Sequence, residues 1–264
     1  MTGLAHTRGG SGPALVLLHG IGSRKEVWEP LLPHLTSLRE VVSIDLPGFG
    51  ASPLRPGEDL SARGLAATVA QFCASLGLDR PHVAGNSLGG WVALEMARAG
   101  GVASVTGISP AGLWRGRVPR YTKWQVRGIH DMPARLDQVL DPLTRITPLR
   151  LMLTANVVGR PWRMPRQALL DDAAAMVGAA GFEPTLAAAS GKRFTGGMVI
   201  DVPTTIAFGA RDVILGPGCR VRDELPAHTR WLTPRGWGHM PVWDDLAGVA
   251  RVLLEGSREI AVAA

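Results

Sequence analysis

Short apolar segments alternate with helical periods along the first 110 residues and again after residue 203, and this alternation limits the possible folds most strongly. The segments with the length of buried strands are 14–19, 41–45, 81–86, 102–108, 204–208 and 229–232. The helical periods between or after them are 27–38, 61–76, 88–99 and 245–256. Strands that alternate with helices indicate βαβ units. The sequence therefore predicts an α/β fold with a mostly parallel sheet flanked by helices.

Residues 111–195 interrupt the alternation. They contain helical stretches at 135–140, 149–158 and 166–180, seven prolines and no convincing strand. A structureless loop of this length is uncommon inside a compact domain, so we expect an inserted helical unit. The predicted organisation is an α/β core built from residues 1–110 and 196–264, with a helical cap over residues 111–195.

The positive charge is concentrated in the insertion. The formal net charge of the chain is +6, and residues 111–195 hold 13 basic and six acidic side chains, which leaves the rest of the chain at −1. A basic segment of this kind can bind nucleic acid. Its arginines are not interleaved with aromatic residues on a binding motif, so a solvated helical surface explains them better. We expect no nucleic-acid partner.

Neither the apolar segments nor the cysteines point to a membrane or to a secreted protein. The longest apolar runs, such as 14–18, are far shorter than the roughly 18 residues that cross a bilayer. The first residues show no basic stretch followed by an apolar one. Cys73 and Cys219 alone form neither a disulfide framework nor a zinc site. We therefore expect a cytoplasmic protein without a membrane span or a metal.

The strongest local motif is Gly85-Asn86-Ser87-Leu88-Gly89, which lies between a predicted strand and a predicted helix. It fits the Gly-x-Ser-x-Gly turn, in which glycines two positions before and after the serine remove side chains that would clash. The turn raises the serine hydroxyl above the sheet and brings the following amides to a helix N-terminus. Ser87 is therefore the candidate nucleophile.

A serine needs a base, and the base needs a carboxylate. His239 lies in a glycine-rich loop after the last predicted strand, where it can reach the same edge of the sheet as Ser87. Asp212 follows the strand 204–208 and belongs to that edge. Asp201 begins the strand and belongs to the opposite end, whereas Asp244 is explained as the N-cap of the last helix.

Two backbone amides are candidates for an oxyanion hole. The N–H of Leu88 directly follows Ser87, and the turn His19-Gly20-Ile21-Gly22 offers the N–H of Ile21. Such donors, aimed at a developing negative charge, lower the barrier of acyl transfer by about 3–4 kcal/mol each. The same residues are also compatible with an ordinary tight turn between strand and helix.

Together these motifs resemble the α/β-hydrolase fold superfamily, over nearly the whole chain. The matching segments are His19-Gly20-Ile21-Gly22, Asp45-Leu46-Pro47-Gly48-Phe49-Gly50, Gly85-Asn86-Ser87-Leu88-Gly89-Gly90, Gly209-Ala210-Arg211-Asp212 and Gly238-His239-Met240-Pro241. The resemblance implies an eight-stranded-type sheet, a catalytic triad of Ser87, Asp212 and His239, and a cap inserted after the sixth strand. It also implies that the cap lines the substrate pocket and that neither a metal nor an organic cofactor is needed.

The nucleophile separates branches of that superfamily. A serine at position 87 argues against the branches that use a carboxylate there, namely haloalkane dehalogenases and epoxide hydrolases. The Gly-Asn-Ser-Leu-Gly-Gly segment resembles small carboxylesterases and the C–C bond hydrolases of aromatic ring-cleavage pathways. The latter usually carry a longer Gly-Pro-Gly-type run at the oxyanion turn, where this chain has Gly20-Ile21-Gly22-Ser23.

The sequence thus predicts a serine hydrolase that cleaves a carboxylic ester, thioester or lactone of a small, partly apolar molecule through an acyl-enzyme on Ser87. C–C bond hydrolysis is the first alternative, and a ligand receptor with little turnover is the second. The residues expected in the substrate pocket are Leu113, Trp114, Trp124, Leu151, Met152 and Trp162. The arginines of the insertion are compatible with an anionic substrate and equally with a solvated surface.

Overall fold

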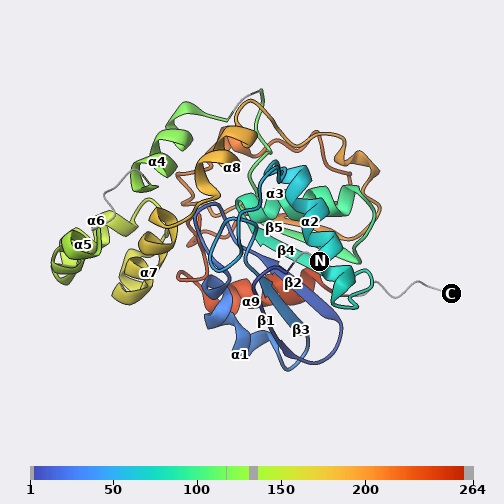
Figure 1. Ribbon diagram of the computed structural model, residues 1–264, viewed down its shortest axis with the longest axis horizontal. Coiled ribbons are helices and arrows are strands. Elements are labelled where there is room, and N and C mark those ends of the chain that lie inside the picture. Colours follow the sequence, from blue (N-terminus) through green and yellow to red (C-terminus); the bar gives the residue numbers. More distant parts are fainter. Residues whose placement is uncertain (1–2, 117, 131–135, 259–264) are drawn as a thin grey trace.

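The computed structural model describes residues 3–116, 118–130 and 136–258, and these form a mostly parallel seven-stranded sheet with helices on both faces (Figure 1). The strand order is β1-β3-β2-β4-β5-β6-β7. The strands are β1 (His6–Gly10), β2 (Ala14–Leu18), β3 (Glu40–Ile44), β4 (His82–Asn86), β5 (Ser104–Ile108), β6 (Thr204–Ala207) and β7 (Arg230–Leu232). The predicted α/β class is confirmed. The described residues contain seven strands and not eight.

Only β1 runs antiparallel, where it pairs with β3 at the edge of the sheet. The pattern of apolar residues did not predict this strand, because His6–Gly10 is largely exposed and contains no apolar residue. The other strands are parallel neighbours, and the register pairs Asn86 of β4 with Ile108 of β5. The carboxyl ends of β4 and β5 therefore meet at the same edge.

Two apolar layers hold the helices to the sheet. On one face, Val16 and Leu18 of β2 belong to the core that includes α2 (Ala62–Ser75) and α3 (Leu88–Arg98). On the other face, Leu15 and Leu17 pack in the core that includes α9 (Leu246–Gly256). Alternate residues of a strand point to opposite faces, so a strand whose side chains are all apolar is covered on both sides.

The prediction of one continuous helix over residues 27–38 is wrong. The chain makes a 3₁₀ segment, η1 (Lys25–Leu31), followed by the short helix α1 (Leu32–Leu35). Pro30 lies inside η1 and Pro33 near the start of α1. Proline has no backbone N–H and its ring crowds the preceding turn, so a continuous α-helix cannot form here.

Between β5 and β6 the described part of the chain is mostly helical and contains no strand. The elements are α4 (Arg120–His130), α5 (Leu136–Arg145), α6 (Thr147–Thr154), η2 (Pro161–Arg163), α7 (Arg166–Val177) and α8 (Phe182–Ala189). Figure 1 shows α4 to α7 to the left of the sheet, and Phe182 of α8 belongs to the same apolar core as α3. The two ends of this segment meet, because the Phe194 N–H donates to the Gly112 carbonyl at 3.0 Å. The sequence did not predict α4 and α8.

After α8 the chain passes through η3 (Gly197–Val199) and returns to the sheet at β6. The segment η4 (Pro217–Cys219) lies between β6 and β7. In the described part of the chain, no helix combines the length and the apolar character that crossing a membrane requires.

Candidate active site

Ser87 occupies a strained turn between β4 and α3. Its backbone has φ 53° and ψ −114°, a combination that non-glycine residues rarely adopt. The neighbouring glycines make the turn possible: a Cβ on Gly85 would lie 2.3 Å from the Gly89 carbonyl carbon. A Cβ on Gly89 would lie 2.2 Å from the Leu18 carbonyl oxygen of β2. The glycines at these positions therefore allow α3 to approach the sheet.

His239 and Asp212 are joined by a buried hydrogen bond. The His239 Nδ1 lies 3.0 Å from Asp212 Oδ2, and both side chains are almost entirely shielded from solvent. The other carboxylate oxygen of Asp212 accepts the backbone N–H groups of Ile214 and Leu215 at 3.0 and 2.8 Å. An ionised carboxylate only accepts, so Nδ1 carries the proton and Nε2 is left as the basic nitrogen.

The surroundings of Asp212 favour its charged form. Burial by itself would raise the pKa of this carboxyl, but the charge and the hydrogen bond of His239 act in the opposite direction, together with the Leu215 N–H. The net effect is a pKa below the ordinary value. Asp212 is therefore ionised at neutral pH and can orient and stabilise the imidazole.

Asp244, the alternative acid, has a different place from the one the sequence predicted. Asp245 is the N-cap of α9, since its carboxylate accepts the Gly248 N–H at 3.0 Å. The Asp244 carboxylate is fully buried and accepts the N–H groups of Gly159 and Gly238, at 2.9 and 2.7 Å, as well as that of Arg160. Asp244 thus ties the inserted segment to the loop of His239.

The loop of His239 is held from two further sides. Its N–H and that of Met240 donate to the Val157 carbonyl at 2.8 and 2.9 Å. The Asn86 Nδ2 donates to the carbonyls of His239 and Ile108 at 2.8 and 3.0 Å. The sequence alone does not indicate these contacts of Asn86 and Asp244, although Asn86 stands next to Ser87.

The turn after β2 brings Ile21 close to Ser87, with the preceding peptide fixed by His19. The His19 Nε2 accepts the Leu46 N–H at 3.0 Å, so its Nδ1 donates to the Gly20 carbonyl at 2.7 Å. Burial lowers the pKa of His19, which keeps the ring neutral. The carbonyl and the N–H of one trans peptide point in opposite directions, so this bond also sets the direction of the Ile21 N–H.

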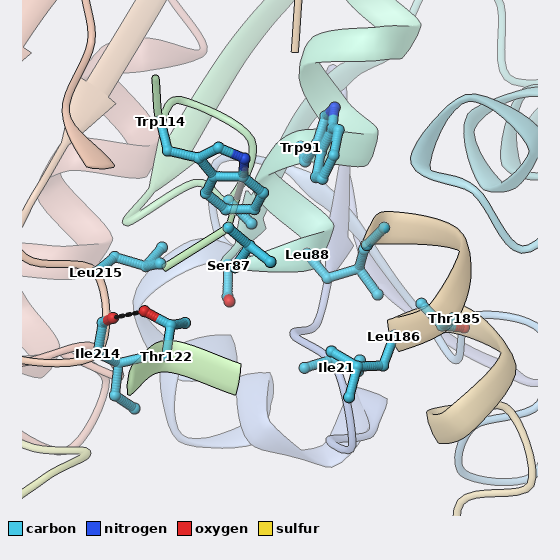
Figure 2. A pocket seen from close by; sticks show the side chains of 13 residues that line it. Ile21, Ser87, Leu88, Trp91, Trp114, Thr122, Thr185, Leu186, Ile214 and Leu215 are labelled. Atoms are coloured by element: carbon cyan, nitrogen blue, oxygen red, sulfur yellow. Dashed lines mark hydrogen bonds between the residues drawn. The ribbon is translucent and has the colours of Figure 1, made fainter. Parts of the chain in front are cut away.

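Ile21, Ser87 and Leu88 line a first cavity of about 60 Å³, which is almost entirely apolar. Figure 2 shows the Ser87 hydroxyl directed into the space between Leu215, Thr122 and Ile21. The Thr122 hydroxyl of α4 donates to the Ile214 carbonyl at 2.7 Å, which links an inserted helix to the loop of Asp212. The two candidate oxyanion residues therefore lie beside the candidate nucleophile.

A second, larger cavity of about 460 Å³ is lined by both Ser87 and His239. The turn after β2 forms one side of it, α4, α6 and α7 contribute further side chains, and the loops of Ser87, Val157, Ile214 and His239 complete it. The side chains from these helices that line it are Gln125, Met152, Leu153, Asp172 and Met176. Ser87 thus lies where the two cavities meet, and the inserted helices cover it.

The residues predicted for the substrate pocket fall into several places. Trp114 lines the first cavity and Met152 the second. Leu113, Leu151 and Trp162 line neither of the two, which corrects the prediction: Leu113 is buried in the core, and Trp162 is 63% exposed on η2. The side chain of Trp124 lies outside the described part of the structure. The lining residues that sequence reasoning missed include Thr122, Gln125, Leu153, Asn156, Asp172, Met176, Thr185 and Leu186.

No group of three or more His, Cys, Asp or Glu side chains stands ready to hold a metal ion within residues 3–116, 118–130 and 136–258. The acid and the base described above are instead organised by each other and by backbone amides.

A serine on a strand-to-helix turn, a buried aspartate–histidine pair and a parallel sheet define an α/β-hydrolase architecture. A model of the Alpha/beta hydrolase family matches residues 15–252, and the chain belongs to this family.

The curated relatives are similar over limited segments. The pimeloyl-[acyl-carrier protein] methyl ester esterase of Aeromonas salmonicida (strain A449) is 44% identical over 94 residues, which are 34% of this chain and 34% of the relative. The enzyme of the same name from Methylococcus capsulatus is 42% identical over 107 residues, 39% of each chain. The chain therefore matches only about a third of the length of these relatives.

Solved structures are similar over nearly the whole chain. A membrane phospholipase A described as a bacterial virulence factor has a TM-score of 0.77 at 25% identity, with 97% of this chain and 84% of that chain covered. A thermophilic esterase from Thermogutta terrifontis has a TM-score of 0.68 at 21% identity, with coverage of 96% and 92%. At 21% identity, the similarity to this esterase shows a shared fold and nothing more.

Proposed function

We propose that the protein is a serine hydrolase that cleaves a carboxylic ester of a small molecule through an acyl-enzyme. Ser87 attacks the ester carbonyl while Nε2 of His239 takes its proton. The amides of Ile21 and Leu88 stabilise the oxyanion. His239 then protonates the leaving alcohol, and water, activated by the same imidazole, releases the acid from Ser87.

The hydrogen bond between His239 Nδ1 and Asp212 Oδ2 is the observation that carries this proposal. It joins residues from two loops in a buried site, and its basic nitrogen belongs to a side chain that lines the same cavity as Ser87. The strained backbone of Ser87 adds independent support, since such strain persists only where the surroundings impose it. The names of the curated relatives favour an ester among the possible acyl substrates.

The two cavities suggest how the substrate lies. His239 must reach the leaving oxygen, and His239 lines the second cavity, so this cavity receives the alcohol part. The first cavity lies beside Ile21 and Leu88 and receives a short apolar acyl group. In this arrangement residues 111–195 act as a cap, because α4 and α8 line the first cavity and α4, α6 and α7 line the second.

Labelling with a fluorophosphonate tests the nucleophile directly. We expect the label on Ser87, no label in Ser87→Ala, and multiple turnover of p-nitrophenyl butyrate that the same substitution abolishes. Ser109 provides a matched control, because it directly follows the neighbouring strand β5 and also has a positive φ, 43°. Labelling that survives in Ser87→Ala but is lost in Ser109→Ala contradicts the proposal. Turnover of a ring-cleavage dienoate without ester turnover favours a C–C bond hydrolase instead.

A further inference from the structure

Three side chains that line the second cavity each carry a buried oxygen with no hydrogen-bond partner among the described residues. These atoms are Ser23 Oγ, Gln125 Oε1 and Asp172 Oδ2. Buried side-chain oxygens nearly always have a partner in native proteins, because an unmade hydrogen bond leaves the cost of desolvation without compensation. Neither the triad nor the oxyanion amides use these atoms. All three side chains border one cavity, so a small turn of each can bring its oxygen to a ligand there.

The three side chains come from elements that pack together. Ser23 belongs to the turn after β2, Gln125 to α4 and Asp172 to α7. Helix α7 lies directly on that turn, since a Cβ on Gly22 would stand 2.8 Å from Cγ of Met176. Met176 follows Asp172 by four residues, so both side chains lie on the face of α7 that meets the turn. Helix α4 packs against α7 and brings Gln125 to the same cavity.

The atoms define the kind of group that fits. The Gln125 carbonyl oxygen and an ionised carboxylate only accept hydrogen bonds, and a serine hydroxyl both accepts and donates. The ligand must therefore present a donor. A full positive charge is disfavoured, because Arg24 already acts on Asp172 and both Ser23 and Gln125 are uncharged.

A hydroxyl group meets these conditions whichever form Asp172 takes. Burial raises the pKa of Asp172 to about 7, an effect that the neighbouring Asp171 reinforces and Arg24 opposes. Asp172 is therefore partly protonated at neutral pH. A ligand hydroxyl can donate to the ionised carboxylate and accept from the protonated one, whereas an ammonium group can only donate.

We propose that Ser23, Gln125 and Asp172 form a subsite that binds a hydroxyl group on the alcohol part of the substrate. The inference rests on the proposed ester hydrolysis, in which the alcohol part occupies the second cavity. The substrate class is then a monoester of a diol or polyol with a short acyl group, and not an ester of a simple alkyl alcohol.

Paired substrates test the subsite. Each ω-hydroxyalkyl butyrate, from the hydroxyethyl to the hydroxyoctyl ester, is compared with the alkyl butyrate of the same length, and butyrate release gives kcat/KM. At the best length we expect the hydroxyl ester to be favoured about tenfold, the usual effect of one hydrogen bond to an otherwise unpaired buried group. Asp172→Leu, Gln125→Met and Ser23→Ala should each reduce this preference several-fold.

Two variants serve as controls. Asp171→Asn changes the adjacent carboxylate, which holds Gln167 Nε2 at 2.9 Å, and Met176→Leu changes an apolar wall of the same cavity. Both should keep the preference. Because the measured quantity is a ratio of two kcat/KM values for one preparation, a variant that folds incompletely does not distort it.

Equal rates for both members of every pair overturn the subsite, as does a preference that persists in all three variants. A larger preference for ω-aminoalkyl butyrates than for the hydroxyl esters overturns the choice of an uncharged group. In each of these cases the alkyl esters are still cleaved, so the proposed function stands. An absence of turnover with every ester and of label on Ser87 removes the proposed function itself, and the subsite with it.

Discussion

The Asn86 side chain donates a hydrogen bond to the backbone carbonyl of His239 at 2.8 Å, so the residue before the candidate nucleophile holds the backbone of the candidate base. The two residues are 153 positions apart in the sequence. The same amide group also donates to Ile108 at the end of β5. One side chain thereby fixes the His239 loop to the strand ends on which Ser87 stands.

We expect Asn86→Leu to lower kcat by about 10- to 100-fold, because a displacement of about 1 Å between reacting groups can cost that much. KM should change less, since Asn86 contributes only to the edge of the second cavity. Steady-state kinetics with p-nitrophenyl butyrate measures both constants. Labelling of Ser87 by a fluorophosphonate should slow in parallel. Unchanged kcat in a folded Asn86→Leu variant would show that the His239 loop is held sufficiently by its other contacts.

Substitution of Asp212 should affect mainly catalysis, whereas substitution of Asp244 should affect mainly stability. Asp212→Asn is expected to lower turnover by about 10⁴-fold, as in other triads where an amide selects the wrong imidazole tautomer. Asp244→Asn should lower it far less, by about tenfold, because Asp244 holds the backbone of the loop and not the ring. It should instead reduce the free energy of unfolding by about 1–3 kcal/mol, since an amide cannot accept three N–H groups as a carboxylate does. Urea unfolding and kinetics on both variants check the assignment, and the reverse pattern would make Asp244 the acid.

Gly89 is buried and should tolerate substitution far less than a glycine on the surface. Alanine normally stabilises a helix relative to glycine, but a Cβ on Gly89 would lie 2.2 Å from the Leu18 carbonyl oxygen. Moving α3 away from β2 costs packing energy, so we expect Gly89→Ala to lose about 1–3 kcal/mol of stability or more, together with activity. Gly101→Ala is the matched control, because nothing lies within 4 Å of its added Cβ. Equal unfolding midpoints for the two variants would contradict the claim that Gly89 is needed for the close approach of α3 to β2.

The sequence was sufficient where the signal is local. Strands covered on both faces appear as uninterrupted apolar runs, and the glycine pattern around Ser87 marks one particular turn. The parallel sheet then brings loops after different strands to one edge, which is why the sequence could place Asp212 and His239 close together, where they share a hydrogen bond. The edge strand β1 lacks such a run, since its side chains are exposed.

The rest depends on partners that are distant in the chain. Asp244 looked like a helix cap because its partners Gly159 and Arg160 are 85 and 84 residues away. The pocket residues failed for a related reason: apolar side chains of the insertion can face the core, a cavity or solvent, as Leu113, Met152 and Trp162 do. Periodicity alone does not distinguish these surroundings.

Asp172 should make the stability of the folded protein depend on pH. Its pKa is 3.8 in the absence of interactions and about 7 in the folded protein, so between about pH 4 and about pH 7 the folded state keeps a proton that the unfolded state releases. The free energy of unfolding therefore falls as the pH rises through this window, in contrast to Asp212, whose lowered pKa gives stability that is lost as the pH falls. Asp172→Asn removes the titration without a large change of shape, so the variant should gain stability relative to the wild type between about pH 5 and about pH 8. Urea unfolding at about pH 5 and about pH 8 measures the difference. Asp171→Asn is the control for a neighbouring carboxylate. Parallel pH profiles for the wild type and Asp172→Asn would mean that Asp172 titrates as an ordinary exposed carboxyl.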